Sequence, residues 1–276
     1  MGKPPSNGVS GAFTCAAGWS AMKPPASLAA RAAELTERLR ARSPRVHCIT
    51  NAVAENYTAN VLLAAGAVPS MTINPAEVQD FVRRADALLV NLGTLDEQRQ
   101  SAIEAALGVA TQTALPWVLD PVFVERSQQR LELAKRLIAR GPAIIRANAA
   151  ELGALMGQEV NGDSLPAFAG RHRTVVALTG VVDRVSDGAS GIAVSNGHAL
   201  MARVTAMGCA ASALMAGYLA VAEDPLEAAA ACLVQVGVAA EAAGATAHGP
   251  GSFAPAYLDA LYNVTPDEIL ARARMD

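Results

Sequence analysis

The sequence predicts a single-domain α/β fold with a mostly parallel central sheet flanked by helices. Three observations support this prediction. Between residues 45 and 156, short apolar runs alternate with segments of helical periodicity, which is typical of a parallel sheet with crossover helices. The chain has 276 residues, which fits one large α/β domain. It is 52% hydrophobic but only 4% aromatic, so its core must consist mainly of Ala, Val and Leu.

The folded domain is expected to span residues 28–276, after a flexible N-terminal extension of residues 1–27. The extension is rich in Gly, Pro, Ser and Ala and lacks the continuous apolar stretch of a secretory signal. A first helix is predicted from Leu28 to Arg42, because apolar residues recur there at helical spacing and Pro44 follows.

Strands and helices are then expected to alternate. Each predicted strand is a short apolar run, and each predicted helix is a longer amphipathic segment. The strands are Val46–Ile49, Val68–Met71, Ala87–Val90, Trp117–Leu119 and Ala143–Ile145, and the helices after them cover 56–65, 75–85, 96–110, 129–140 and 149–156.

The remaining chain predicts one more strand, a hairpin and a run of helices. The strand is Val175–Leu178, and the turn dipeptide Asp187-Gly188 joins the hairpin strands Asp183–Ser186 and Gly191–Val194, which we expect at one sheet edge. Two later helices open with a capping residue, proline at the first helical position and a glutamate. The predicted helices are 209–222, 225–245, 255–262 and a last one opened by Thr265-Pro266-Asp267-Glu268.

Charge and cysteine usage exclude several classes of protein. The net charge is −3 and the 22 basic residues do not cluster, which argues against nucleic-acid and anionic membrane partners and favours a small molecule. The four cysteines are scattered without a C-x-x-C pair, which argues against a zinc site or disulfide framework and favours a reducing cytoplasm. The apolar stretches near 209–222 and 228–240 are too short to span a membrane and are predicted to be buried helices.

Common catalytic motifs are also absent. Lysine occurs only at positions 3, 23 and 135, so there is no G-x-x-x-x-G-K-[ST] loop and no late lysine for a Schiff base. No G-x-G-x-x-G follows an early strand, no G-x-S-x-G occurs, and the four histidines lack short zinc-ligand spacing.

What remains is a series of polar residues just after the predicted strands. In an open α/β sheet, ligands bind beyond the carboxyl ends of the strands. Any one of these segments could be a simple turn, but six in succession favour a binding site. They are His47 with Thr50-Asn51, Met71-Thr72, Asn91-Leu92-Gly93-Thr94, Asp120-Pro121, Arg146-Ala147-Asn148 and Thr179-Gly180.

These segments resemble, in order, the motifs of the hydroxyethylthiazole kinase family. The opening signature is His47-Cys48-Ile49-Thr50-Asn51 followed by Asn56-Tyr57-Thr58-Ala59-Asn60. The resemblance extends from about residue 28 to residue 265 and includes Asn91–Thr94, Leu119–Val122, Ile145–Glu151, Thr179-Gly180, Gly208-Cys209 and Gly249–Phe253. It implies a ribokinase-like three-layer sandwich and phosphorylation of the alcohol of a thiazole precursor of thiamine, with ATP as co-substrate and Mg²⁺ as cofactor. It also implies a homotrimer with active sites at subunit interfaces.

The resemblance implies roles for the metal and nucleotide residues. Asn148-Ala149-Ala150-Glu151 is similar to the N-x-x-E motif that holds magnesium, and Asp120 could share this work. Arg146, Thr179 and Asn148 match ATP-contacting positions. Alternatively, Glu151 could only interact with a helix dipole and Arg146 could form a surface salt bridge.

Other residues are expected to bind the substrate and the transferred phosphoryl group. The segment from Ala206 through Gly208 and Cys209 leads into a helix, whose free N–H groups could stabilise that phosphoryl group. A thiol at a helix N-terminus has a lowered pKa, so Cys209 could act as base or hydrogen-bond partner, although it could also merely pack. Met71 matches the thiazole-contacting position, and His47, Asn51 and Ala206 are further candidates for substrate binding.

The chain departs from the family pattern at three places. Ala206-Met207 replaces Gly-Thr, Phe123–Arg126 replaces a glycine-rich stretch, and Ala147 and Ala150 replace Gly and Ser. If residue 206 has a positive φ, alanine costs about 1 kcal/mol or more relative to glycine. Two alternatives follow: a kinase of another small heterocyclic alcohol, and a catalytically weakened ligand sensor on the same fold.

Overall fold

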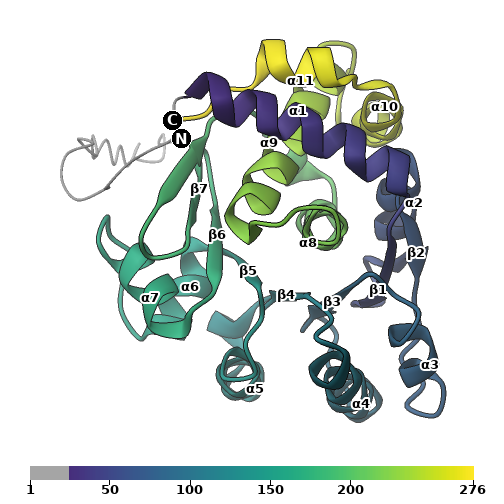
Figure 1. The fold of residues 1–276 in the computed structure, drawn as a ribbon, viewed down its shortest axis with the longest axis vertical. Helices are drawn as coiled ribbons and strands as arrows, with labels where there is room; N and C mark the ends of the chain where they lie inside the picture. Colours follow the sequence, from purple (N-terminus) through teal and green to yellow (C-terminus); the bar gives the residue numbers. More distant parts are fainter. Residues whose placement is uncertain (1–24) are drawn as a thin grey trace, which may run out of the picture.

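The computed structural model describes residues 25–276 and contains one eight-stranded sheet with helices on both faces (Figure 1). The strand order is β2-β1-β3-β4-β5-β6-β7-β8. Strands β1 to β6 are mutually parallel, whereas β7 is antiparallel to both β6 and β8. The strands are β1 (Arg45–Ile49), β2 (Val68–Ser70), β3 (Ala87–Asn91), β4 (Trp117–Asp120), β5 (Ile144–Asn148), β6 (Val175–Thr179), β7 (Asp183–Ser186) and β8 (Gly191–Val194).

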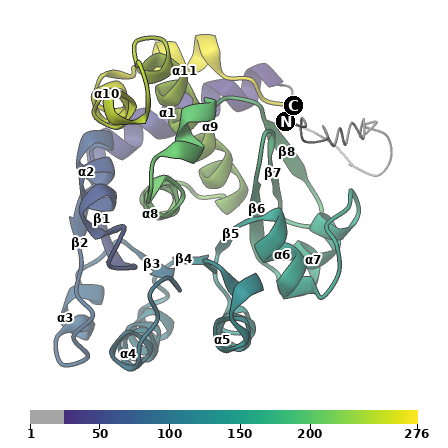
Figure 2. The ribbon, with the colours of Figure 1, turned by 180° about the vertical axis from the view of Figure 1, so that it is seen from behind.

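The helices divide into two layers, which Figures 1 and 2 show from opposite sides. One layer contains α1 (Pro25–Arg42), α2 (Glu55–Ala65), α8 (Met207–Leu219), α9 (Pro225–Gly244), α10 (Pro250–Asn263) and α11 (Pro266–Arg272). The other contains α3 (Val78–Val82), α4 (Glu97–Thr113), α5 (Gln128–Ile138), α6 (Ala149–Met156) and α7 (Ser164–His172). Short 3₁₀ helices cover Val124–Arg126 (η1) and Ala199–Arg203 (η2). The predicted α/β sandwich is therefore confirmed.

Each layer has its own apolar core because successive strand residues point to opposite faces of the sheet. On β1, Val46 and Cys48 pack with the α8 and α9 layer, whereas Ile49 packs with the α3 and α4 layer. Small residues dominate α8 and α9, so these helices lie close together and close to the sheet.

The hairpin is confirmed at the sheet edge. Strand β7 pairs with both β6 and β8, and Gly188 in the connecting turn has a φ of 98°, a conformation that glycine adopts without strain. The C-terminal segment pairs with the outer strand through an antiparallel bridge between Val194 and Met275. It therefore covers part of an edge that would otherwise expose unpaired backbone groups.

Several boundaries differ from those expected. Helix α7 was not predicted. The helix expected at 75–85 is only Val78–Val82, and α10 begins at Pro250 rather than 255 because Pro250 provides a favourable first position. Helix α1 begins at Pro25, and residues 1–24 of the expected extension lie outside the described residues.

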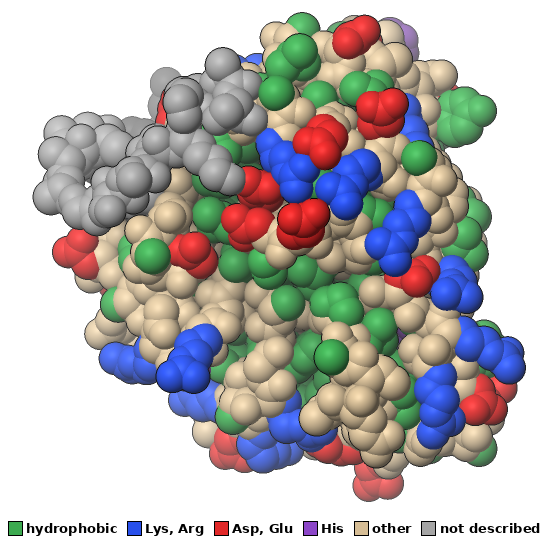
Figure 3. All heavy atoms as spheres, viewed as in Figure 1, with side chains coloured by type: hydrophobic (Ala, Val, Ile, Leu, Met, Phe, Trp, Pro, Cys, Tyr) green, Lys and Arg blue, Asp and Glu red, His purple; other side chains and the backbone are tan. Residues whose placement is uncertain are grey.

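Among the described helices, α9 is long and apolar enough to cross a membrane by length and composition. Most of this helix is buried inside the fold, and Asp224 caps it by accepting a hydrogen bond from the N–H of Leu226. The prediction that this segment is a buried helix is confirmed, whereas the prediction that it is too short to span a membrane is wrong, because the helix extends over Pro225–Gly244. On the face in Figure 3, acidic and basic side chains are interspersed, as the absence of basic clusters in the sequence predicts.

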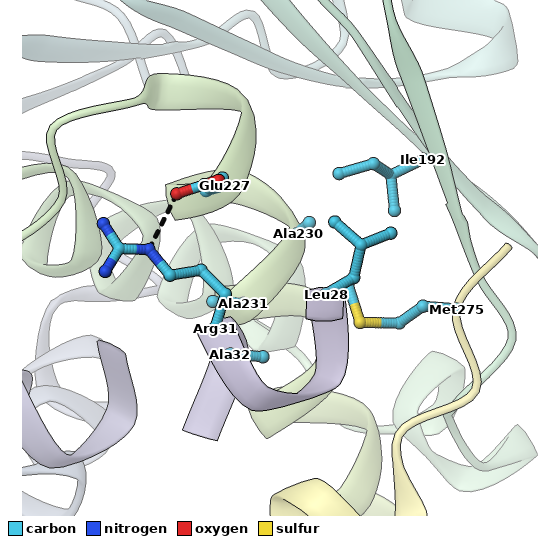
Figure 4. Close-up of a pocket in the computed structure, with 8 residues that line it drawn as sticks. All are labelled: Leu28, Arg31, Ala32, Ile192, Glu227, Ala230, Ala231 and Met275. Atoms are coloured by element: carbon cyan, nitrogen blue, oxygen red, sulfur yellow. Dashed lines mark hydrogen bonds and ion pairs between the residues drawn. The ribbon is translucent and has the colours of Figure 1, made fainter. Parts of the chain in front are cut away.

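A small recess, partly open to solvent, lies between the start of α1, α9, β8 and the C-terminal segment (Figure 4). Its lining is apolar apart from an ion pair in which Arg31 Nε lies 2.7 Å from Glu227 Oε2. None of the polar residues at the strand ends lines this recess.

Candidate active site

The polar strand ends meet where the strand order reverses. The chain passes from β1 to β2 on one side of β1 and then crosses to β3 on the other side. Such a switch point leaves a crevice beyond the carboxyl ends of the strands. Asn51 follows β1, while Asn91 and Asp120 end β3 and β4 and are direct partners in the β3–β4 register. Helix α8 packs on these strands and brings its first turn to the same place.

Five side chains form a hydrogen-bonded cluster there, which we call the polar cluster: Asn51, Asn91, Asp120, Cys209 and Ser212. Asn51 Nδ2 donates to Asn91 Oδ1 at 3.1 Å and to Cys209 Sγ at 3.3 Å. Asn91 Nδ2 donates to Asp120 Oδ2 at 2.7 Å, and Ser212 Oγ donates to the same oxygen at 2.9 Å. The cluster thus links β1, β3, β4 and α8.

Asp120 is fully buried, and its two oxygens have different surroundings. Oδ2 accepts two hydrogen bonds, whereas Oδ1 has no hydrogen-bond partner. Burial raises the pKa of this carboxyl, and the charge of Arg146 and the two donors only partly oppose that effect. A buried carboxylate oxygen without a partner is costly unless a proton or a cation satisfies it. Oδ1 of Asp120 is therefore suited to a ligand.

The expected lowering of the Cys209 pKa is wrong. Burial, and to a smaller extent the nearby negative charge of Asp120, raise the pKa of the thiol to about 11. These two effects outweigh the hydrogen bonds from Asn51 and Asn91 and the positive charge of Arg146, which lower the pKa. Near neutral pH Cys209 is therefore a thiol that can hydrogen-bond to a substrate hydroxyl, and the thiolate needed for a general base is scarce.

The first turn of α8 offers an anion site. Helix geometry leaves the N–H groups of residues 207–209 without an intrahelical acceptor, and the N-cap residue, Ala206, has no side-chain oxygen to cap them. Gly208 lies against Arg146, because a Cβ added at Gly208 would lie 2.9 Å from Arg146 Nη1. Open N–H groups, the helix dipole and a guanidinium together favour a phosphate.

Ala206 adopts the left-handed conformation, with φ 67° and ψ −5°. The condition under which alanine costs stability at this position is therefore met. Phe123, in the second departing segment, also has a positive φ of 57°, its side chain is half exposed, and the Arg126 guanidinium lies over its ring. Both departing segments thus carry backbone strain.

Asn148 and Glu151 form a capping box at the start of α6. Asn148 Oδ1 accepts from the Glu151 N–H, and Glu151 Oε2 accepts from the Asn148 N–H, both at 2.9 Å. Glu151 Oε1 also accepts from the N–H of Phe123 at 3.1 Å. Burial raises the pKa of Glu151, and the like charge of Asp120 adds to this effect. The two carboxyl groups are therefore close enough to interact, and a shared cation would relieve both.

The described residues contain no group of three or more His, Cys, Asp or Glu side chains that could hold a metal ion. An all-protein metal cage is thus absent from residues 25–276. Magnesium, however, usually takes one or two carboxylates and completes its shell with waters and substrate phosphates. The unpartnered Asp120 Oδ1 and the neighbouring Glu151 fit that smaller requirement.

The remaining nucleotide candidate, Thr179, lies at the end of β6 beside β5. It pairs with Asn148 in the β5–β6 register, and its Oγ1 lies 3.5 Å from the carbonyl oxygen of Ala147. Asp183 lies nearby on β7, and its Oδ1 accepts from the N–H of Gly180 at 2.9 Å. Burial raises the pKa of Asp183, an effect partly offset by Arg146.

The two other substrate candidates lie near β2. Met71 follows β2 and packs against the core on the α8 side of the sheet. His47 is fully buried, its Nδ1 lies 2.9 Å from Ser70 Oγ, its ring centroid is 5.7 Å from that of Phe81, and burial lowers its pKa to about 4. These contacts are with residues of β2 and α3 and not with Cys209. Within one chain, His47 therefore lies outside the polar cluster.

Sequence reasoning did not identify Ser212 or Asp183, and it gave Asn91 no individual role. Ser212 follows Cys209 by three residues, a spacing that places both on the same face of a helix, so this signal was available. Asp183 lies close enough to Arg146 for their charges to interact because β7 pairs with β6, and the sequence does not show this pairing.

Comparison with known proteins identifies proteins similar to this chain. The model of the "Hydroxyethylthiazole kinase family" matches residues 36–267. A hydroxyethylthiazole kinase from Klebsiella pneumoniae is 48% identical over 246 residues, which cover 83% of this chain and 94% of that protein. The structure of a hydroxyethylthiazole kinase from Pyrococcus horikoshii superposes with a TM-score of 0.84 at 38% identity, over 89% of this chain and 98% of that one. A ribokinase-like superfamily protein from Enterococcus faecalis shares the fold, with a TM-score of 0.63 at 13% identity over 82% of this chain and 89% of that one.

Proposed function

The chain belongs to the hydroxyethylthiazole kinase family, and we propose from this premise that it transfers the γ-phosphate of ATP to the hydroxyl of 4-methyl-5-(2-hydroxyethyl)thiazole. The observation that carries the proposal is the meeting of the α8 N-terminus with Arg146 beside the polar cluster. A site for a transferring phosphoryl group thereby lies next to a site for an alcohol.

Phosphoryl transfer requires mainly positioning and charge stabilisation, because its transition state is loose and its charge spreads over the equatorial oxygens. The open N–H groups of residues 207–209 stabilise that charge without reorganising. Arg146 neutralises phosphate charge, with Thr179 and Asn148 as further nucleotide contacts. Cys209 and Asn51 orient the substrate hydroxyl in line with the γ-phosphate, while Met71 and the backbone at Ala206 contact the thiazole.

Magnesium is the proposed metal, and Asp120 and Glu151 are its proposed protein ligands. When bound, it would neutralise the phosphate oxygens of ATP. The support is the unpartnered Oδ1 of Asp120 and the raised pKa of both carboxyls. The Asn148–Glu151 capping box fixes the position of the Glu151 carboxylate.

The test is conversion of ATP to ADP by the purified protein with the thiazole alcohol, with and without magnesium, beside a Cys209→Ala variant. Phosphorylated thiazole that forms only with magnesium, and more slowly in the variant, supports the proposal. Thiazole binding without any product would favour the alternative of a weakened ligand sensor.

A second acceptor is the main alternative, and a specific observation favours testing it. Ala206, which replaces a family glycine, and Phe123, in a segment that replaces a glycine-rich stretch, both adopt positive φ. The anion site and its neighbourhood are therefore shaped by strained, bulkier residues. A panel of small heterocyclic alcohols at equal concentration distinguishes the two acceptors by their kcat/KM.

We also propose a homotrimer with active sites at the subunit interfaces. Support comes from the edge of the sheet at the three-residue strand β2, where the side chains of Val68 on the strand, Leu63 on α2 and Phe81 on α3 are apolar and exposed. Light scattering of a Leu63→Glu variant, with Leu270→Glu on α11 as the matched exposed control, tests this surface. Only the first variant should lower the molar mass. The cytoplasmic location stays a prediction, supported by the free thiols of Cys48, Cys209 and Cys232.

A further inference from the structure

The amide of Asn51 has only one orientation that satisfies its neighbours, and that orientation is set by Asn91. The N–H of Gly93 donates to Asn91 Oδ1 at 2.9 Å, and a backbone N–H cannot accept. The atom of Asn91 that faces Gly93 must therefore be its oxygen, so its NH₂ group faces Asp120 Oδ2.

The same reasoning continues to Cys209. Because the Asn91 oxygen is an acceptor, the Asn51 atom beside it at 3.1 Å must be its NH₂ nitrogen. That nitrogen has a second hydrogen, which is directed at Cys209 Sγ at 3.3 Å. The N–H of Gly93 thus fixes the orientation of the Asn91 amide, which in turn fixes the Asn51 amide with its NH₂ group toward Cys209 Sγ.

Steric contact fixes Asn51 from another side. A Cβ added at Gly93 would lie 2.7 Å from Asn51 Cβ and 2.8 Å from its Nδ2, so the absence of a side chain at 93 lets Asn51 lie flat against the backbone after β3. Asn51 and Asn91 are both buried, so water does not readily replace either contact.

We propose that Asn91 is a positioning residue for phosphoryl transfer, which acts by holding the Asn51 amide with its NH₂ group toward Cys209. The Asn51 carbonyl oxygen is thereby turned away from both Asn91 and the sulfur and is available to the substrate hydroxyl. This inference rests on the proposed function for its kinetic consequence, whereas the orientation of Asn51 can be measured without any substrate.

The kinetic test is a double-mutant cycle on the holoenzyme with ATP and the thiazole alcohol. Asn91→Ala is expected to lower kcat about tenfold or more, with the KM for ATP changed less than about twofold. In an Asn51→Ala background the same substitution should lower kcat by less than about twofold, because the residue through which it acts is absent. Equal losses in both backgrounds would assign the effect to the direct hydrogen bond between Asn91 and Cys209 and would overturn the proposal.

Ser212→Ala is the matched control, because Ser212 donates to the same Asp120 oxygen as Asn91, while its other hydrogen bond goes to the Gly208 carbonyl and not to Asn51. A loss of kcat equal to that of Asn91→Ala would assign the effect to Asp120 and overturn the proposal. If Asn91→Ala fails to fold, Gly93→Ala serves instead, since it displaces Asn51 sterically and leaves the Asn91–Asp120 bond in place. It should reproduce the loss of kcat, and an unchanged kcat in this variant would overturn the proposal.

Crystal structures of the wild-type protein and the Asn91→Ala variant decide the structural part. Loss of the 3.3 Å contact between Asn51 Nδ2 and Cys209 Sγ in the variant supports the proposal, and an unchanged Asn51 overturns it. If the wild-type protein phosphorylates no thiazole alcohol, the proposed function fails, while this comparison still decides whether Asn91 orients Asn51.

Discussion

Replacing Ala206 by glycine is expected to stabilise the fold while leaving the phosphate site intact. Ala206 has φ 67° and ψ −5°, where the Cβ of an L-residue is strained by about 1–2 kcal/mol. Glycine removes that strain but gives the unfolded chain more freedom, which costs about 0.4–1 kcal/mol. The net gain is therefore about 0.5–1 kcal/mol.

Thermal unfolding makes this gain measurable. Unfolding entropy is about 2.1 cal/mol/K per residue, so a chain of 276 residues gains about 1–2 °C in Tm. Ala220→Gly at the other end of the same helix is the matched control, because Ala220 has an ordinary helical φ of −70° and should lose about 0.5–1 kcal/mol. Opposite signs for the two variants are expected. If Ala206→Gly destabilised the protein as much as Ala220→Gly, the strain argument would be refuted.

Three further predictions concern the site itself. Alkylation of Cys209 by iodoacetamide, followed by mass spectrometry of its peptide, should rise about tenfold per pH unit from 7 to 10 without a plateau, because its pKa is raised to about 11; a plateau near pH 8 would contradict this. Asp120→Asn should lower kcat about 10²-fold or more. It should also raise Tm at pH 7 but not at pH 4. Burial raises the pKa of Asp120 in the folded state above its unfolded value, so the carboxyl destabilises the fold as the pH rises from the unfolded value through the folded-state pKa. An equal Tm change at both pH values would argue against this. Gly208→Ala, whose Cβ would lie 2.9 Å from Arg146 Nη1, should raise the KM for ATP about tenfold with little change in Tm, and an unchanged KM would separate Arg146 from the nucleotide.

Much of the fold could be predicted because its signals are local. Apolar runs identified the strands, helical periodicity identified most of the helices, and Asp187-Gly188 identified the hairpin. Helix α7 was missed because its segment is short and contains Pro166 and Gly170, which weaken the helical pattern. The family resemblance could be predicted because the strand-end motifs occur in the family's order along the chain. The comparisons confirmed it.

The site was predicted as a set of strand ends and not as a set of contacts. The cross-strand pairing of Asn91 with Asp120 and the donation from Ser212 follow from sheet register and helix placement, which no local pattern contains. The pKa of Cys209 was predicted in the wrong direction, because the helix N-terminus is visible in the sequence while burial and the charge of Asp120 are not.

The sequence by itself determined the layered α/β architecture, the family and the identity of the polar strand ends, because these depend on periodicity and on residues close together in the chain. Only the tertiary structure decided that residue 206 has a positive φ, that Arg146 lies against the first turn of α8, and that Asn91 fixes the Asn51 amide. The last two properties are contacts between residues distant in the chain. Pairing of β1 with β3 brings Asn51 to Asn91, 40 positions away, and packing of α8 on the sheet brings its first turn to Arg146.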